Sequence, residues 1–95
     1  MEVKVRYLSV DIANQFGSEK QIETLNIPDD AKYEHLLSLF SEKWKENNKE
    51  QSGKMKEGVL GTFVFISNGK NLRRIKDEKV NPESEVLVAY ADTGG

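Results

Sequence analysis

The chain has 95 residues, a formal net charge of −2 and 37% hydrophobic residues, which is the profile of one small soluble domain. It contains no cysteine and a single histidine, so disulfides, thiolate metal sites, cysteine nucleophiles and multi-histidine metal sites are excluded. The acidic balance argues against direct nucleic-acid binding, and no apolar run approaches the ~20 residues of a membrane span.

The N-terminal part of the chain predicts two paired strands. It lacks the regions of a signal peptide, so we expect a cytoplasmic protein. Residues 2–7 alternate apolar and charged side chains, the pattern of a half-buried strand. The apolar positions shift phase over residues 8–12, which we interpret as a bulge or bend. Turn residues at 14–20 and renewed alternation at 21–27 predict a second strand that forms a hairpin with the first.

Residues 28–47 have the clearest helical pattern, with Asp29 or Asp30 available as the N-terminal cap. His35 lies on this helix and is expected at an exposed flank with no catalytic role. The polar loop 47–57 is either a solvated connection or a lysine-presenting loop that contacts a partner. The apolar stripe of the helix consists of Tyr33, Leu36, Leu37, Phe40 and Trp44.

The next segment predicts a second hairpin, because Asn68-Gly69 stands between apolar runs. The strand before it, 59–66, presents apolar side chains on both sides. One helix covers only one face of a sheet, so either the long loop or a partner must cover the other set. The pattern leaves open which set lies outside. One set is Val59, Phe63 and Phe65, and the other is Leu60, Val64 and Ile66.

A basic group follows this hairpin. Its two interpretations are a charged strand edge that prevents edge-to-edge pairing, and a docking site for an acidic partner or for RNA held by a partner. The group consists of Lys70, Arg73, Arg74 and Lys76.

The predicted order is strand, strand, helix, strand, strand, strand. It indicates an α+β fold in which the last strand lies parallel to the first and one helix covers one face of a mixed sheet. We expect a single domain over residues 1–91 and a flexible tail, 92–95, ending in Gly94-Gly95. Glycine lets a backbone thread a narrow channel, and a terminal glycine carboxylate is the least hindered one a chain can present. The tail extends at most about 14 Å.

Three motifs carry a family resemblance that covers the whole chain. They are "IPDDAKYEHLL" at 27–37, "NGK" at 68–70 and "ESEVLVAYADTGG" at 83–95. With this element order, the chain resembles the ubiquitin-like β-grasp superfamily, which implies a mixed sheet of four to five strands and one main helix. Within it, the chain is most similar to the sulfur-carrier branch: the small subunit of molybdopterin synthase, the thiamine-biosynthesis sulfur carrier and the ubiquitin-related modifier.

The resemblance implies a protein substrate rather than an enzyme, with no catalytic residues, no metal and no bound cofactor. An activating enzyme would use ATP-Mg to adenylate Gly95, and would recognise the tail through Asp92, Thr93 and Gly94. A sulfurtransferase or other persulfide donor would convert Gly95 to a thiocarboxylate, which would serve a tRNA-thiolation or molybdopterin-synthase partner. Target-protein lysines could instead capture the activated carboxyl as an isopeptide. An end at Gly-Gly would need no maturation protease, and a monomer is expected.

The alternative function is a non-covalent ubiquitin-like interaction domain that acts through an exposed apolar sheet face. Both functions need a partner surface on the body of the domain. The residues predicted for it are Leu60, Val64, Ile66, Arg73 and Arg74.

Overall fold

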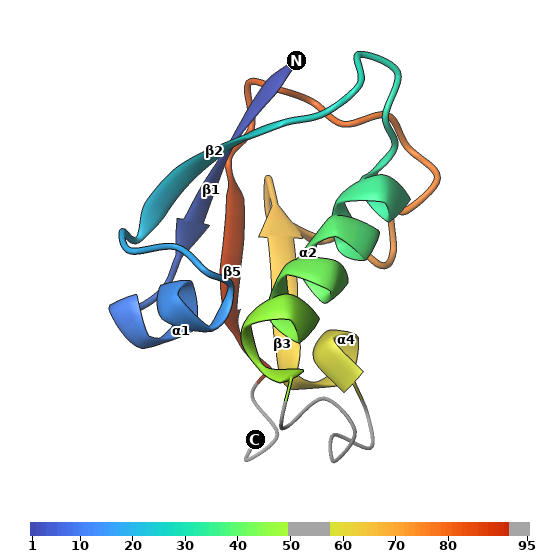
Figure 1. Ribbon diagram of the computed structural model, residues 1–95. Coiled ribbons are helices and arrows are strands. Elements are labelled where there is room, and N and C mark those ends of the chain that lie inside the picture. The colour runs from blue at the N-terminus through green and yellow to red at the C-terminus, as the bar shows by residue number, and fades with distance from the viewer. Residues whose placement is uncertain (50–57, 92–95) are drawn as a thin grey trace.

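A computed structural model describes residues 1–49 and 58–91, which form one five-stranded sheet with helices packed against it (Figure 1). The order of the strands across the sheet is β2-β1-β5-β3-β4. The strands are β1 (Glu2–Tyr7), β2 (Ile22–Asn26), β3 (Phe63–Ser67), β4 (Lys70–Asn71) and β5 (Val86–Tyr90). The helices are α1 (Val10–Gln15), α2 (Tyr33–Asn47) and α4 (Gly58–Thr62).

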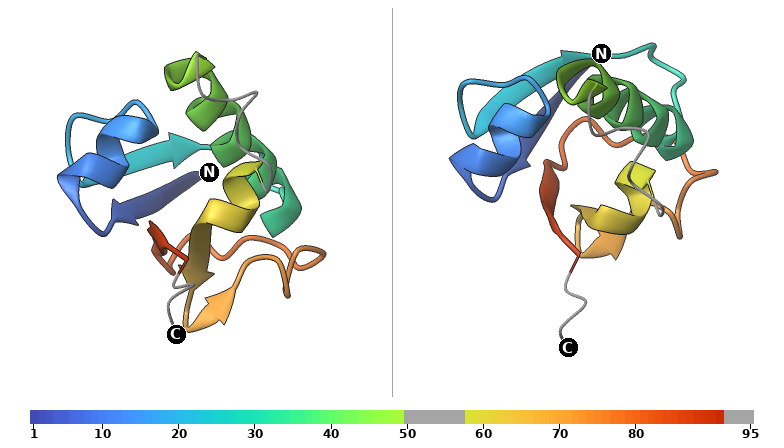
Figure 2. Two further views of the ribbon diagram at one scale, coloured as in Figure 1. Left: turned by 90° about the horizontal axis from the view of Figure 1, so that it is seen from below. Right: turned by 60° about the horizontal axis from the view of Figure 1, so that its bottom comes forward.

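The two central strands are the first and the last in the chain. β1 and β5 run parallel, with Val5 opposite Val86, while β2 and β3 pair antiparallel on either side. A parallel pair needs a crossover connection, and α2 lies in that crossover and covers one face of the sheet (Figures 1 and 2). The mixed sheet and its main helix confirm the predicted fold class.

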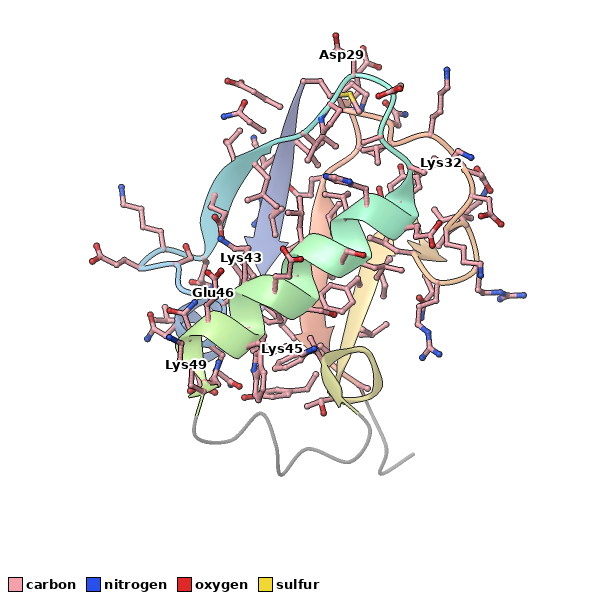
Figure 3. The ribbon with its side chains drawn as sticks, turned by 45° about the vertical axis from the view of Figure 1, so that its right-hand side comes forward. Asp29, Lys32, Lys43, Lys45, Glu46 and Lys49 are labelled. Carbon is pink, nitrogen blue, oxygen red and sulfur yellow. The ribbon has the colours of Figure 1, made fainter. Side chains whose placement is uncertain are left out.

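The main helix α2 buries the predicted apolar stripe from Tyr33 to Trp44, and Leu37 at 7% is the most exposed member. Each such side chain contributes ~1.5–3 kcal/mol before entropy is subtracted. The predicted cap was wrong. The helix begins after Lys32, which makes no side-chain capping bond, and Asp29 instead accepts a hydrogen bond from the Met1 ammonium at 3.0 Å. Figure 3 shows Lys32 at the start of α2 and Asp29 on the loop that leads to it.

The bulged strand predicted over residues 8–12 is also wrong, because this segment enters the helix α1. Ser9 caps the helix by accepting a hydrogen bond from the Ile12 amide at 3.2 Å. The buried positions Ile12, Ala13 and Phe16 follow helical spacing, which outweighs the strand-like alternation of the exposed Leu8 and Val10.

Phe16 forms the centre of the core and was missed from the sequence. Its side chain is 0% exposed. Its ring contacts four others, with centroid distances of 5.6 Å to Tyr7, 5.9 Å to Phe40, 4.9 Å to Phe63 and 6.1 Å to Phe65. These rings come from β1, α2 and β3, so the residue that follows α1 contacts both the sheet and the main helix through one side chain.

The strand predicted over 59–66 begins only at Phe63, because residues 58–62 form the helix α4. Val59 and Phe63 are both buried, and a spacing of four residues places them on one side in a helix as well as in a strand. The hairpin after β3 is confirmed. Asn68 and Gly69 have φ angles of 52° and 77°, as a type I′ turn requires.

Candidate functional site

The candidate site lies where the chain leaves the sheet. β5 ends at Tyr90, at the end of the sheet where α1 and α4 lie (Figure 1). Ala91 is the last residue of the described part, and its amide donates a hydrogen bond to the Thr62 carbonyl at 2.9 Å. The predicted recognition and activation residues, Asp92, Thr93, Gly94 and Gly95, lie outside the described residues.

Tyr90 is held at this end by its ring and by its hydroxyl. The ring stacks on Phe63 with a centroid distance of 5.2 Å. The hydroxyl donates a hydrogen bond to Asp11 Oδ2 at 2.7 Å and accepts one from Gln15 Nε2 at 2.5 Å. The hydrogen bond to Asp11 raises the pKa of Tyr90 above its ordinary value of 10.0, with a smaller contribution from burial. The phenol is therefore neutral, and able to donate, at physiological pH.

The sheet presents its second face away from α2. Phe63 and Phe65 point into the core, whereas Val64 and Ile66 point to this open face and are half-buried, which answers the question that the sequence left open. Opposite them, β5 contributes Ala89 beside Val64, and the equally half-buried Leu87 beside Ile66. Since α1, α2 and α4 pack on the other side, no helix of the described part covers these four residues.

The open face is divided into an apolar half and a charged half. The register places Ile22, Arg6, Leu87 and Ile66 in one row across four strands. Arg6 pairs with Glu85 at 2.8 Å between Nε and Oε1, and Lys4 is also exposed. The apolar half therefore lies over β5 and β3.

The structure separates the two predicted arginines. Arg74 joins Val64 and Ile66 around a groove of about 540 Å³ on the open face. Arg73 instead lines a groove of about 550 Å³ against α2, opposite Glu34 and Glu42. The side chain of Leu60, the fifth predicted member, lies outside the described residues. Three of the five predicted surface residues thus share one surface: Val64, Ile66 and Arg74.

Sequence reasoning missed the exposure of three apolar side chains, Leu8, Val10 and Ile22. Leu8 is 60% exposed, Val10 50% and Ile22 44%. The Leu8 amide donates to the Val88 carbonyl at 2.8 Å, so this residue lies beside the final strand. The sequence did contain an indication of this exposure. Lys4 and Arg6 point outward from β1, and Leu8 follows them at the same spacing of two residues, with an apolar side chain in place of a charged one.

The remaining site classes were searched over residues 1–49 and 58–91. No group of three His, Cys, Asp or Glu side chains in these ranges could hold a metal ion. His35, expected at an exposed helix flank, is exposed. None of the helices in these ranges is long and apolar enough to cross a membrane.

Comparison with known proteins gives matches among solved structures. No family model matches the chain, and no curated protein does. Small archaeal modifier protein 1 (SAMP1) of Haloferax volcanii is 15% identical, with a TM-score of 0.62 and all of both chains covered. A Pyrococcus furiosus protein named molybdopterin converting factor, subunit 1, is 18% identical, with a TM-score of 0.61 over 95% of this chain and 97% of its own.

A third solved structure is similar to the chain over nearly all of its length. Small archaeal modifier protein 1 of Methanosarcina acetivorans is 21% identical, with a TM-score of 0.57 over 99% of this chain and 96% of its own. The chain therefore has the ubiquitin-like β-grasp fold. In particular, it shares the fold of the small archaeal modifier proteins, and the predicted resemblance is confirmed at this level.

Proposed function

We propose that this chain is a ubiquitin-like carrier whose Gly95 carboxylate is activated by a separate ATP-dependent enzyme. The observation that carries the proposal is the end of β5. Its pairing with β3 and the Ala91–Thr62 hydrogen bond bring the chain to the edge of the domain four residues before Gly95. A tail of that length reaches at most about 14 Å from the body. An enzyme could thus act on the terminal carboxylate while it holds the folded domain outside its active site.

The fold supports this function in a second way. The proteins that share it are named modifiers and a subunit of a molybdopterin converting factor, which are names for proteins that work with partners. The chain itself has no cysteine to act as a nucleophile. Its role is then that of a substrate, and the catalytic groups, together with ATP-Mg, belong to the partner enzyme. A cytoplasmic setting would supply the ATP.

The chemistry begins with adenylation. A carboxylate oxygen of Gly95 attacks the α-phosphorus of ATP and pyrophosphate leaves. The terminal sulfur of a persulfide on a sulfurtransferase then attacks the acyl carbon, and AMP leaves with the bonding electron pair. A partner thiol reduces the resulting acyl disulfide, which forms a new disulfide and releases the thiocarboxylate. The sulfur then serves a tRNA-thiolation or molybdopterin-synthase partner.

The same adenylate permits conjugation. A neutral lysine amine of a target protein can attack the acyl carbon in place of the persulfide, which gives an isopeptide bond and AMP. Lysines of this chain are also candidates. Lys45 and Lys49 lie toward the end of α2 and Lys32 at its start (Figure 3). Both routes require Gly95, so they differ only in the nucleophile.

Removal of Gly95 gives the primary test. The intact protein is incubated with the activating enzyme of its host, ATP-Mg and a persulfide source, and its mass is measured. We expect a mass gain equal to the exchange of one oxygen for sulfur, and its absence in a chain that lacks Gly95. If an enzyme of demonstrated activity gives neither pyrophosphate release nor an AMP adduct, the activation proposal is wrong.

The open sheet face favours a second candidate function, a non-covalent interaction domain. Val64, Ile66, Leu87 and Ala89 form an apolar surface that no helix of the described part covers. Ile66→Glu would place a charge at its centre and abolish non-covalent binding, while the chain that lacks Gly95 would still bind. Lys20→Glu, an exposed change at the far edge of the sheet, is the matched control. Binding that survives the loss of Gly95 without any activation would favour this candidate.

A further inference from the structure

A closed hydrogen-bonded group lies at the root of the tail. Its members are Asp11, Gln15 and Tyr90, from α1 and the last position of β5. The Tyr90 hydroxyl bonds to both partners, at 2.7 Å to Asp11 Oδ2 and 2.5 Å from Gln15 Nε2. Gln15 Nε2 also reaches Asp11 Oδ2 at 3.4 Å, which closes the triangle. The group joins positions 75 to 79 residues apart in sequence.

The group is anchored to the core through Gln15. Its side-chain oxygen accepts a hydrogen bond from Trp44 Nε1 at 3.2 Å, and Trp44 is 1% exposed. Its backbone carbonyl accepts another from Asn48 Nδ2 at 2.8 Å. The end of α2 therefore fixes α1, and α1 fixes the Tyr90 hydroxyl.

Two further contacts hold the same point of the chain. The Tyr90 ring stacks on Phe63, which is 2% exposed. The Ala91 amide donates to the Thr62 carbonyl at 2.9 Å. Residues at a chain end fray unless they are tied down. Here the last described residues are held by a side-chain hydroxyl, an aromatic ring and a backbone amide, each bound to a different partner.

Folding alone does not account for this group. Tyr90 is 48% exposed, so water could solvate its hydroxyl in place of Asp11 and Gln15. Contacts between exposed polar groups contribute little to stability. Orientation is a different matter, because a chain segment that is already ordered loses less conformational freedom when a partner binds it. A tail of four residues has little length with which to correct an error at its start.

We propose that Asp11, Gln15 and Tyr90 form a positioning group that fixes the point, at Tyr90 and Ala91, from which the tail is presented to a partner. The inference rests on the proposed activation of Gly95. Tyr90 acts as a positioning residue and takes no part in the chemistry. When the partner enzyme docks on the body, the group presents the tail from one fixed point, so that less ordering is needed as the complex forms.

The test variant is Tyr90→Phe, and the matched control is Tyr33→Phe. Tyr33 lies at the start of α2, and its hydroxyl accepts a hydrogen bond from the Asn81 amide at 3.1 Å. Both substitutions therefore remove a phenol hydroxyl that makes a hydrogen bond. Hydrogen exchange of the Ala91 amide reports on the tail root directly. We expect exchange to accelerate about fivefold in Tyr90→Phe and to stay unchanged in Tyr33→Phe.

The enzymatic readout is ATP–pyrophosphate exchange by the activating enzyme. We expect KM for Tyr90→Phe to rise about fivefold with kcat nearly unchanged, because the ordering is transferred to complex formation. Asp11→Ala is expected to raise KM by less, because the hydrogen bond from Gln15 to the Tyr90 hydroxyl remains. The double variant is expected to be no worse than Tyr90→Phe, which already removes both bonds of the hydroxyl. The inference is overturned, and the proposed function is left intact, by either of two results. One is that the Asp11→Ala and Tyr90→Phe effects on KM add in the double variant. The other is that Tyr90→Phe and Tyr33→Phe have the same KM and the same exchange rate of the Ala91 amide. A wild-type chain that the active enzyme does not adenylate overturns the proposed function with it.

Discussion

Phe16→Ala is the substitution expected to disturb this fold most clearly. The Phe16 ring is fully buried and has four aromatic neighbours, on β1, α2 and β3, at centroid distances from 4.9 to 6.1 Å. The residue belongs to a segment with no other ring, directly after a helix of six residues. Its loss would leave a cavity between the sheet and the main helix, which neighbours held in a packed core fill only partly.

Truncation of a buried phenylalanine costs about 3–5 kcal/mol. The upper part of that range is expected here, because each aromatic pair adds about 0.5–1.5 kcal/mol beyond its buried area. A small domain has about 5–15 kcal/mol of stability in total, so a loss of this size is a large fraction of it. At about 4–8 °C per kcal/mol for a domain of this size, the Tm of the variant falls by more than about 12 °C.

Urea unfolding provides the assay, followed by the fluorescence of Trp44, the single tryptophan of the chain. The matched control is Leu8→Ala, which also shortens an apolar side chain next to α1, but one that is 60% exposed. The control is expected to change the free energy of unfolding by less than about 0.5 kcal/mol. A loss below about 1 kcal/mol for Phe16→Ala would refute the placement of this ring at the centre of the core.

Three further predictions concern single contacts. Burial, followed by the hydrogen bond to Glu23, raises the pKa of Tyr7 above its ordinary 10.0. Above pH 10 the unfolded chain therefore loses this proton while the folded chain keeps it, so stability falls by about 1.4 kcal/mol per pH unit. Tyr7→Phe should remove that part of the alkaline slope in urea titrations, and an unchanged slope would contradict the argument. Gly69→Ala should cost about 1 kcal/mol because φ is 77°, although no atom lies within 4 Å of the added carbon; an unchanged urea midpoint would exclude strain at this turn. Glu85→Gln breaks the exposed pair with Arg6 and should change stability by less than about 1 kcal/mol, and a larger loss would indicate a buried role.

The parts of the fold that follow one regular period could be predicted from the sequence. The alternation over residues 2–7, the stripe of α2 and the Asn68-Gly69 turn each have a single structural interpretation, and all three are confirmed. The parallel pairing of β1 and β5 followed from the position of the helix between them.

The short helices could not be predicted, because five or six residues are too few to separate two periods. Val59 and Phe63 fit both a strand and a helix, and Leu8 and Val10 imitate a strand while Ile12 and Phe16 determine the helix. The candidate site, too, could be predicted only in part. Val64 and Ile66 could be recognised as one side of a strand, but the separation of Arg73 from Arg74 depends on the turn after β4. The Tyr90 group depends on contacts between residues 75 or more positions apart.

The parallel pair at the centre of the sheet has a mechanical consequence. β1 begins at one end of the domain and β5 finishes at the opposite end, with the two strands side by side (Figure 1). A force that pulls the tail away from Met1 would act along both strands in opposite directions. It would load the hydrogen bonds between them together, in shear, and would not open them one after another. Forced unfolding is governed by the unfolding rate. An unfolding machine that draws on the tail would therefore meet its greatest resistance at the first step, while a pull applied across the sheet would separate the strands sequentially.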